Sequence, residues 1–315
     1  MVPAPASAPG TIRTTCAYCG VGCGIRAEVA GERSVTIKGD PEHPANFGRL
    51  CSKGTHLGET VALDGRLLTP MIGQSQAGWD EALDMVAGKM RDCIATHGPD
   101  SVAFYVSGQL LTEDYYVANK LMKGFVGSAN IDTNSRLCMA SAVAAHNRAF
   151  GEDIVPVTYD DLEEADLIVL VGSNTAWCHP VIWQRIEAAR EARGTKIVVI
   201  DPRRTETAEQ ADLHVAVAPD GDVALFNALL ADMVRRGLAE DVAAAVDGNG
   251  GVDPTVFAAL SEMVAAHPRM VTVFSMGANQ SVAGTDKGNA IINLHIATGR
   301  INAPGAGPFS MTGQP

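Results

Sequence analysis

Continuous apolar runs of strand length are the clearest pattern in the second half of the chain. The runs Leu167–Val171 and Ile197–Ile200 are short, rich in β-branched residues and bounded by polar or glycine-containing segments, which is typical of buried parallel strands. The second predicted strand is 196–200, with Lys196 before the apolar run. Between them, Pro180 can begin a helix that carries Ile182 and Ile186 on one face. This alternation of strands and helices predicts α/β layers around a parallel sheet.

The same pattern continues toward the N-terminus with weaker signals. Residues 101–106 predict a strand. Residues 112–122 predict a helix in which Thr112 serves as the N-cap and acidic residues occupy the first turn. No run of about 18 apolar residues occurs, so the sequence predicts no transmembrane helix.

The charge balance narrows the classes of ligand. The chain has 315 residues, enough for about two domains. Its 24 Lys and Arg against 36 Asp and Glu give a net charge of −12, which disfavours a generic nucleic-acid or anionic-membrane surface. An anionic ligand must therefore meet a local positive pocket. Residues 1–10 contain neither an apolar signal segment nor a twin-arginine pair, so we expect a flexible leader on a cytoplasmic protein.

Four of the seven cysteines are crowded into the N-terminal region. Cys16, Cys19, Cys23 and Cys51 form a C-x2-C-x3-C-x27-C pattern. An odd cysteine count without a secretory signal argues against a disulfide framework. Zinc is a second alternative, because four thiolates can close a tetrahedral site. Three closely spaced thiolates and a distant fourth favour a [4Fe–4S] cluster instead.

The cysteine array and the following segment 50–54, Leu-Cys-Ser-Lys-Gly, resemble the start of the molybdopterin oxidoreductase superfamily. This superfamily includes dimethyl sulfoxide reductase, formate dehydrogenase and bacterial nitrate reductase. The resemblance implies a small N-terminal iron–sulfur domain followed by Rossmann-like, doubly wound α/β domains of the dimethyl sulfoxide reductase type. It also implies that Lys53 lies between the cluster and a pterin, with roles in electron transfer and cofactor binding.

Polar segments follow the two strongest predicted strands, where open α/β sheets bind ligands. They lack the G-x-G-x-x-G fingerprint, so the residues alone give a nicotinamide site weak support and leave a structural turn as an alternative. Arg203 and Arg204 are suited to pyrophosphate oxygens. The resemblance implies that one guanosine arm of a bis(molybdopterin guanine dinucleotide) cofactor binds at Gly172, Ser173, Asn174, Asp201, Arg203 and Asp222. Residues 219–222 read Pro-Asp-Gly-Asp where relatives often have Pro-Gly-Thr-Asp.

Cys138 stands between a polar loop and an alanine-rich segment that predicts a helix. Thiols at helix N-termini lose their protons more readily, as metal ligation requires, although buried packing is the alternative on the residues alone. Segment 134–142 resembles the molybdenum-ligating stretch of bacterial nitrate reductases, which implies that Cys138 is the molybdenum ligand and a catalytic residue. Met139 follows it where formate dehydrogenases have histidine, so the resemblance favours nitrate over formate.

Further segments, 107–115, 173–180, 275–280 and 304–315, resemble the cytoplasmic assimilatory nitrate reductase catalytic subunits. This resemblance implies that Gln109, Asn134, Met276 and Gln280 contact the pterin or line the substrate pocket. On the residues alone, they are ordinary core or loop residues.

The activity implied by the resemblance is reduction of nitrate to nitrite by oxygen-atom transfer at molybdenum, with electrons arriving through the cluster. Ferredoxin, flavodoxin and a NAD(P)H-dependent flavoprotein are the candidate electron donors. Two alternatives stay open: a formate dehydrogenase of the same superfamily, and an iron–sulfur electron-transfer module without catalysis.

The expected organisation is a leader at 1–10, a [4Fe–4S] domain at 11–65, and an α/β domain at 66–160 carrying the molybdenum ligand. A dinucleotide-binding-like domain at 161–285 and a return to the preceding domain at 286–315 complete it. Because members of the superfamily continue well beyond the matching part, we expect a C-terminally truncated fragment that alone binds the molybdenum cofactor poorly.

Overall fold

The computed structural model describes residues 10–31, 33–240 and 248–311, which form two compact units. The smaller unit comprises Val29–Val35 and Gly58–Arg136. The larger unit comprises Gly10–Glu28, Thr36–Leu57 and the described chain from Leu137 onward. In the parts of the chain that are described, no helix is long and apolar enough to cross a membrane.

A five-stranded parallel sheet forms the centre of the larger unit. Its order is β10-β9-β8-β11-β12, and each neighbouring pair is parallel. The strands are β8 (Leu167–Val171), β9 (Lys196–Ile200), β10 (Leu213–Val215), β11 (Met270–Phe274) and β12 (Gly307–Ser310). The two apolar runs predicted as strands are confirmed as β8 and β9. Every residue of β8 is buried, as expected for a strand covered on both faces.

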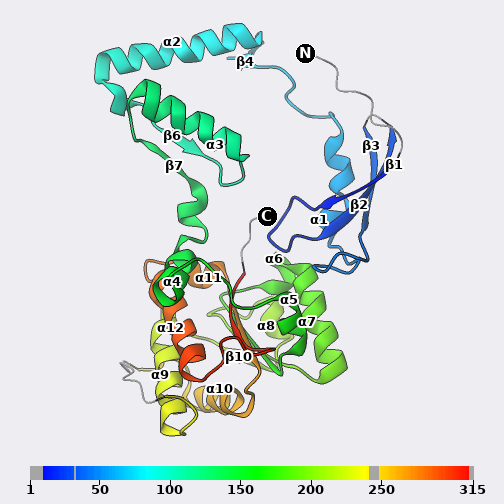
Figure 1. Ribbon diagram of the computed structural model, residues 1–315, viewed down its shortest axis with the longest axis vertical. Helices are drawn as coiled ribbons and strands as arrows, with labels where there is room; N and C mark the ends of the chain where they lie inside the picture. Colours follow the sequence, from blue (N-terminus) through cyan, green and yellow to red (C-terminus); the bar gives the residue numbers. More distant parts are fainter. Residues whose placement is uncertain (1–9, 32, 241–247, 312–315) are drawn as a thin grey trace. The chain divides into compact units, whose positions relative to one another are not determined.

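Helices cover both faces of this sheet (Figure 1). Val169 and Val171 belong to a core that includes residues of α4 (Ala140–Phe150), α9 (Asp222–Arg235), α10 (Pro254–Ala266) and α12 (Gly284–Ala297). Ile168 and Leu170 belong to a second core, with residues of α5 (Tyr159–Glu164) and α7 (Pro180–Arg193). Pro180 begins α7, as predicted. The short helices are α6 (Thr175–Cys178), α8 (Glu206–Glu209) and α11 (Met276–Asn279).

The N-terminal part of the chain forms a three-stranded sheet of order β1-β2-β3. Its elements are β1 (Gly10–Thr15), β2 (Gly24–Gly31) and β3 (Ser34–Gly39), followed by α1 (Ser52–Thr55) and the 3-10 helix η1 (Leu57–Val61). Cys16, Val21, Cys23 and Ile25 are buried in the same core as α5 and α7. This core therefore fixes the cysteine-bearing loop to one face of the central sheet.

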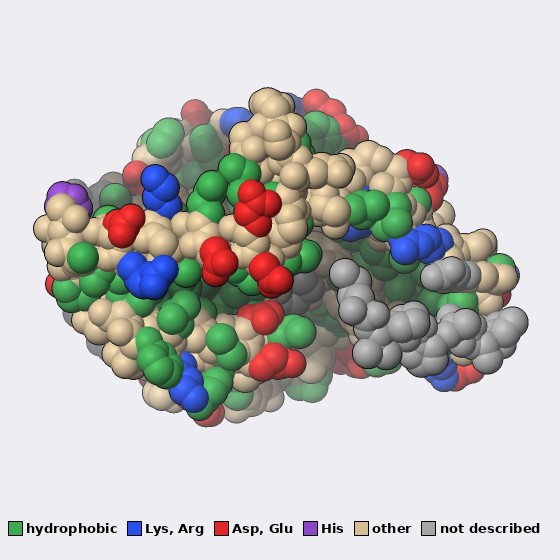
Figure 2. Space-filling model, turned by 90° about the horizontal axis from the view of Figure 1, so that it is seen from above, with side chains coloured by type: hydrophobic (Ala, Val, Ile, Leu, Met, Phe, Trp, Pro, Cys, Tyr) green, Lys and Arg blue, Asp and Glu red, His purple; other side chains and the backbone are tan. Residues whose placement is uncertain are grey.

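The smaller unit contains β6 (Phe104–Val106) paired in parallel with β7 (Ile131–Thr133). Its other elements are β4 (Met71–Ile72), β5 (Ser75–Gln76), α2 (Trp79–His97), the 3-10 helix η2 (Pro99–Ser101), α3 (Thr112–Asn119) and the π-helix η3 (Lys120–Val126). No residue of α2 is buried. Figure 2 shows hydrophobic side chains exposed between acidic and basic ones.

The prediction that Thr112 caps its helix is wrong. Leu111 is the N-cap, and its N–H donates to the carboxylate of Asp114 at 3.2 Å. The carboxylate of Asp114 in the first turn therefore provides a hydrogen-bond acceptor for a backbone N–H at the helix N-terminus, and Thr112 becomes the first helical residue. The helical run extends past the expected end at 122 as a π-helix up to Gly127, which has φ of 82°.

Candidate functional site

Four cysteines line one small cavity, the thiol chamber. Cys16, Cys19, Cys23 and Cys51 share its wall with the apolar side chains of Val21, Leu50, Pro180 and Val181. Cys16 and Cys23 are buried, and the other two are half-buried. The structure thus brings together all four predicted cluster ligands, although Cys51 is distant in sequence.

Backbone hydrogen bonds shape the loop that carries the first three thiols. The N–H of Cys16 donates to the carbonyl of Cys23 at 2.8 Å, and the N–H of Gly22 donates to the carbonyl of Cys19 at 3.2 Å. Gly22 has φ of 67°, a conformation that glycine adopts without steric cost. Cys51 immediately precedes α1, whose Thr55 N–H donates to its carbonyl at 3.0 Å. These bonds hold the loop closed around the chamber.

The chamber suits a group that binds thiolates. Burial raises the pKa of Cys16 and raises that of Cys23 to about 12, and the neighbouring thiols act in the same direction. The ammonium group of the exposed Lys53 acts against this rise at Cys16. Iron would replace the protons and offset the cost of burying thiolates among apolar side chains. The donor set and its apolar walls therefore fit a four-iron cluster.

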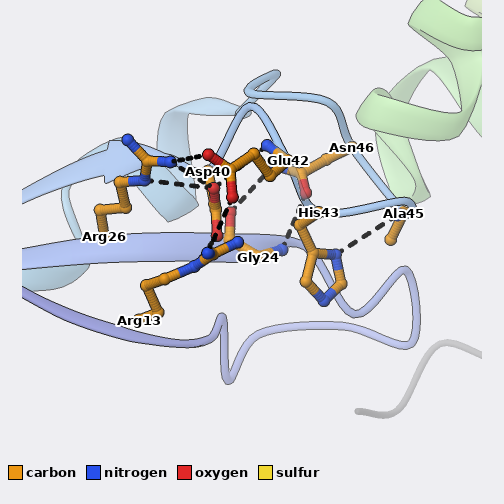
Figure 3. Close-up of polar contacts among 8 residues, drawn as sticks. All are labelled: Arg13, Gly24, Arg26, Asp40, Glu42, His43, Ala45 and Asn46. Atoms are coloured by element: carbon orange, nitrogen blue, oxygen red, sulfur yellow. Dashed lines mark hydrogen bonds and ion pairs between the residues drawn. The ribbon is translucent and has the colours of Figure 1, made fainter.

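A charge network stabilises the base of the cysteine-bearing loop (Figure 3). Asp40 is 2% exposed and accepts hydrogen bonds from Arg13 at 2.6 Å and Arg26 at 3.1 Å. Burial alone would raise the pKa of Asp40, but hydrogen bonds from the Glu42 N–H and Arg13 lower it below the ordinary value. Asp40 is therefore held ionised between the strands that begin and end the loop.

A cavity of about 410 Å³, the crevice, opens beside the central sheet. Strand order reverses at β8, which has β9 on one side and β11 on the other. Open α/β sheets bind ligands at such a switch point, at the carboxyl ends of the strands. Of the predicted nucleotide and pterin contacts, the lining includes Gly172, Asp201, Arg203, Asp222 and Gln280.

Two predicted contacts after β8 serve the loop instead of lining the crevice. The buried Ser173 hydroxyl lies 2.9 Å from the hydroxyl of Thr175. The side-chain oxygen of Asn174 accepts a hydrogen bond from Thr207 at 2.7 Å. Met276, the first residue of α11, is half-buried and is also not among the residues that line the crevice.

Sequence reasoning missed Lys287. Its side chain is 3% exposed, and its Nζ lies 2.8 Å from Asp220 and 2.9 Å from Asp222. All three residues line the crevice. The available signal was Asp220, a second carboxylate two residues before Asp222, because a nearby cation stabilises neighbouring carboxylates in their charged form.

Cys138 is half-buried, two residues before α4 and directly after the 3-10 helix η4 (Asn134–Leu137). Burial raises the pKa of its thiol. The side-chain amide of Gln280 donates to the carbonyl of Leu137 at 3.0 Å, and the amide of Asn279 donates to the sulfur of Met139 at 3.0 Å. The segment that lines the crevice thus holds both neighbours of Cys138.

Gln109 and Asn134 belong to the smaller unit. The side-chain oxygen of Asn134 accepts a hydrogen bond from the N–H of Gly108, and the N–H of Gln109 donates to the hydroxyl of Ser107 at 3.2 Å. Asn134 therefore fixes the loop that carries Gln109. Their roles toward a pterin stay predictions.

Comparison with known families gives two adjacent matches. Residues 10–63 match the molybdopterin oxidoreductase Fe4S4 domain, and residues 66–312 match molybdopterin oxidoreductase. A nitrate reductase of Klebsiella oxytoca is 52% identical over 96% of this chain, which spans 37% of that relative's length. An F420-dependent formate dehydrogenase subunit of Methanococcus maripaludis is 33% identical over 96% of the chain and 48% of the relative.

A solved structure has the same fold. Acetylene hydratase from Pelobacter acetylenicus matches with a TM-score of 0.72 and 22% identity, over 93% of this chain and 44% of that one. The predicted α/β fold with an N-terminal iron–sulfur domain is therefore confirmed. The expected domain boundaries stay predictions.

Proposed function

Because the chain belongs to the molybdopterin oxidoreductase family, we propose that it provides the cluster-binding and molybdenum-ligating part of a nitrate reductase. The reaction is reduction of nitrate to nitrite and water with two protons and two electrons. The observation that carries the proposal is that the thiol chamber, Cys138 and the crevice all lie in one compact unit. The chain that contains them is 52% identical to a nitrate reductase.

The residues divide the work in a definite way. When bound, a bis(molybdopterin guanine dinucleotide) cofactor supplies the oxygen-atom transfer and a [4Fe–4S] cluster supplies single electrons. Cys16, Cys19, Cys23 and Cys51 hold the cluster, and the thiolate of Cys138 ligates molybdenum. The remaining predicted residues bind the cofactor or hold the loops that bind it: Lys53, Gln109, Asn134, Gly172, Ser173, Asn174, Asp201, Arg203, Asp222, Met276 and Gln280.

The crevice is suited to one nucleotide arm of that cofactor. Arg203 is exposed at its edge, where a guanidinium can meet pyrophosphate oxygens in two parallel hydrogen bonds. Asp222 is the first residue of α9 and presents a carboxylate, which can accept the two N–H donors on one edge of guanine. Ser173 and Asn174 support these contacts by holding the loop after β8.

A short stretch of chain joins the two cavities. Gly172 lines the crevice, and Pro180 and Val181 line the thiol chamber. The intervening residues include the short helix α6. The two cavities are therefore positioned by one short segment of the chain, Gly172 to Val181.

Metal analysis and electron paramagnetic resonance of the anaerobically purified chain test the cluster. We expect about four iron atoms per chain and a reduced-cluster signal after dithionite. Cys51→Ser should lose the signal, whereas Cys93→Ser, outside the chamber, should retain it. Zinc in place of iron, or a signal that survives Cys51→Ser, would refute the assignment.

Nitrate chemistry is tested by replacing the matching segment of the Klebsiella enzyme with this chain. The chimera should reduce nitrate with methyl viologen as donor and should not oxidise formate. Cys138→Ser in the chimera should lose molybdenum and activity while keeping its iron. Iron without molybdenum in the unmutated chimera would favour an electron-transfer module, and formate oxidation would favour the dehydrogenase.

The proposed setting is the cytoplasm. A one-electron cluster is compatible with three donors: ferredoxin, flavodoxin or a NAD(P)H-dependent flavoprotein. Anaerobic mixing of the reduced chain with each donor would separate them by the rate of cluster oxidation or reduction.

A further inference from the structure

Arg185 is a buried arginine at the junction of the cysteine-bearing region and the central sheet. It lies on α7, and its side chain has no solvent exposure. Its Nε donates to Glu163 at 2.6 Å, and its Nη2 donates to Asp160 at 3.1 Å. Its Nη1 donates to the backbone carbonyls of Pro44 at 2.7 Å and Ala45 at 3.0 Å.

Arg185 makes more contacts than are required to neutralise its positive charge. A buried cation is costly unless it is paired, and the two carboxylates of α5 meet that need. The two carbonyl bonds reach instead to the loop at residues 44–47, about 140 positions away in sequence. The guanidinium carbon also lies 5.1 Å from the ring centre of Phe47 and 5.4 Å from that of Tyr159. Arg185 therefore fastens this loop to α5 and α7.

The fastened loop in turn fixes two cysteine-bearing segments through Asn46. This residue is fully buried, and its side-chain oxygen accepts from the N–H of Gly24 at 2.8 Å. Its amide donates to the carbonyls of Gly24 at 3.0 Å and Arg49 at 2.8 Å. Gly24 directly follows Cys23, and Arg49 precedes Cys51 by two residues.

Tyr159 provides a second path from Arg185 to the chamber. Its hydroxyl donates to the carbonyls of Gly20 at 3.2 Å and Val21 at 3.1 Å, between Cys19 and Cys23. Burial raises the pKa of Tyr159 to about 12, so the hydroxyl keeps its proton. The first turn of α7 adds Pro180 and Val181 to the chamber wall. Each path thus ends on backbone next to the thiols.

We propose that Arg185 is a positioning residue for the cluster, which holds the ligand segments through Asn46 and Tyr159 and thereby sets the lifetime and reduction potential of the bound cluster. Groups behind the ligands orient them, and hydrogen bonding and solvent access tune cluster potentials. The inference rests on the cluster-binding part of the proposed function and is independent of nitrate.

The test compares the full-length wild-type chain with three variants, each reconstituted with its cluster. Arg185→Met removes all four hydrogen bonds. Arg185→Lys keeps the charge but not the planar set of guanidinium donors, and Tyr159→Phe removes only the hydroxyl. The matched control is Arg300→Lys, because Arg300 is 6% exposed and donates to the carbonyls of Val264 and Pro268, away from the chamber. The measurements are iron content, melting temperature, the rate of cluster loss to a ferrous chelator, and the potential from a redox titration.

We expect Arg185→Met to lose the cluster about 10- to 100-fold faster than wild type, the factor by which metal affinity falls when groups that orient metal ligands are removed. Arg185→Lys should be intermediate, and Tyr159→Phe should accelerate loss and shift the potential while melting like wild type. Arg300→Lys should melt lower without a change in potential or in loss rate.

Two results would overturn the inference. One is a Tyr159→Phe chain and an Arg185→Lys chain whose cluster loss and potential match wild type. The other is an Arg300→Lys chain that changes both as much as Arg185→Lys does, since Arg185 would then act only through global stability. A wild-type chain that takes up no iron would overturn the proposed cluster function as well, so the two failures are distinguishable.

Discussion

Replacing Lys287 with methionine removes an ammonium group that lies between two carboxylates of the crevice. Methionine has a similar volume and an unbranched stem, so packing changes little. The carboxylate of Asp222, 9% exposed, loses the cation at 2.9 Å. The carboxylate of Asp220, 58% exposed, can gain water in its place.

The expected cost follows from this difference in exposure. Removing one partner of a buried ion pair destabilises a protein by about 3–5 kcal/mol, because the other charge stays buried without compensation. Since Asp220 can be rehydrated, Asp222 accounts for most of the effect, and we expect about 3 kcal/mol for Lys287→Met. Adding Asp222→Asn removes the uncompensated charge and should recover most of that loss.

Urea unfolding of the full chain measures this effect through the fluorescence of Trp183, which is 6% exposed in the same unit. Lys196→Met is the matched control, because Lys196 is half exposed and pairs with Asp212 at 3.1 Å on the surface. The control should cost less than about 1 kcal/mol. A Lys287→Met chain as stable as the control, or a double variant no more stable than Lys287→Met alone, would refute the reasoning.

Two further changes probe the same unit. Complete burial lowers the pKa of His295 from its ordinary 6.5 to about 3, so the unfolded chain binds a proton that the folded chain does not. As the pH is lowered from 6.5 to 3, the free energy of unfolding should therefore fall by about 1.4 kcal/mol per pH unit. His295→Gln should reduce this pH dependence in urea unfolding, and an unchanged pH dependence would contradict the role of His295. Gly277→Ala would place a methyl group 2.6 Å from the Cα of Gly172, so we expect a loss of at least about 1–3 kcal/mol in the same assay. Gly88→Ala, within α2 of the smaller unit and with open space around it, should stabilise that unit by up to about 1 kcal/mol, followed through Trp79 at the start of α2; equal effects of the two alanines would contradict a steric cause.

The parts of the fold that sequence could predict are those decided by local pattern. β8 coincides with its apolar run, and β9 adds only the exposed Lys196 before its run, because a strand buried on both faces needs no polar alternation. Pro180 begins α7 because its missing N–H costs nothing in a first helical turn. Thr112 failed as a cap because the helix begins one residue earlier, with Leu111 as the N-cap, whose N–H donates to the Asp114 carboxylate.

The residues of the candidate site also differ in whether a local sequence pattern could predict them. The spacing of Cys16, Cys19 and Cys23, with Cys51 as a fourth cysteine, predicted a metal site. No local pattern marked Asn46, which holds the carbonyl of Arg49 two residues before Cys51. Lys287 lies 65 residues beyond Asp222, and no periodicity joins a lysine to a carboxylate at that distance. Such contacts follow from the order of strands in the sheet.

Both cavities depend on the backbone of β8. Ile168 and Leu170 pack in the core that contains Cys16 and Cys23, whereas Val169 and Val171 pack in the core with α9 and α12. The strand then ends at Gly172 in the crevice. Because successive side chains of a strand point to opposite faces, a shift of β8 by one residue would move both cores at once. Close packing on both faces of β8 therefore holds the thiol chamber and the crevice in a fixed relation.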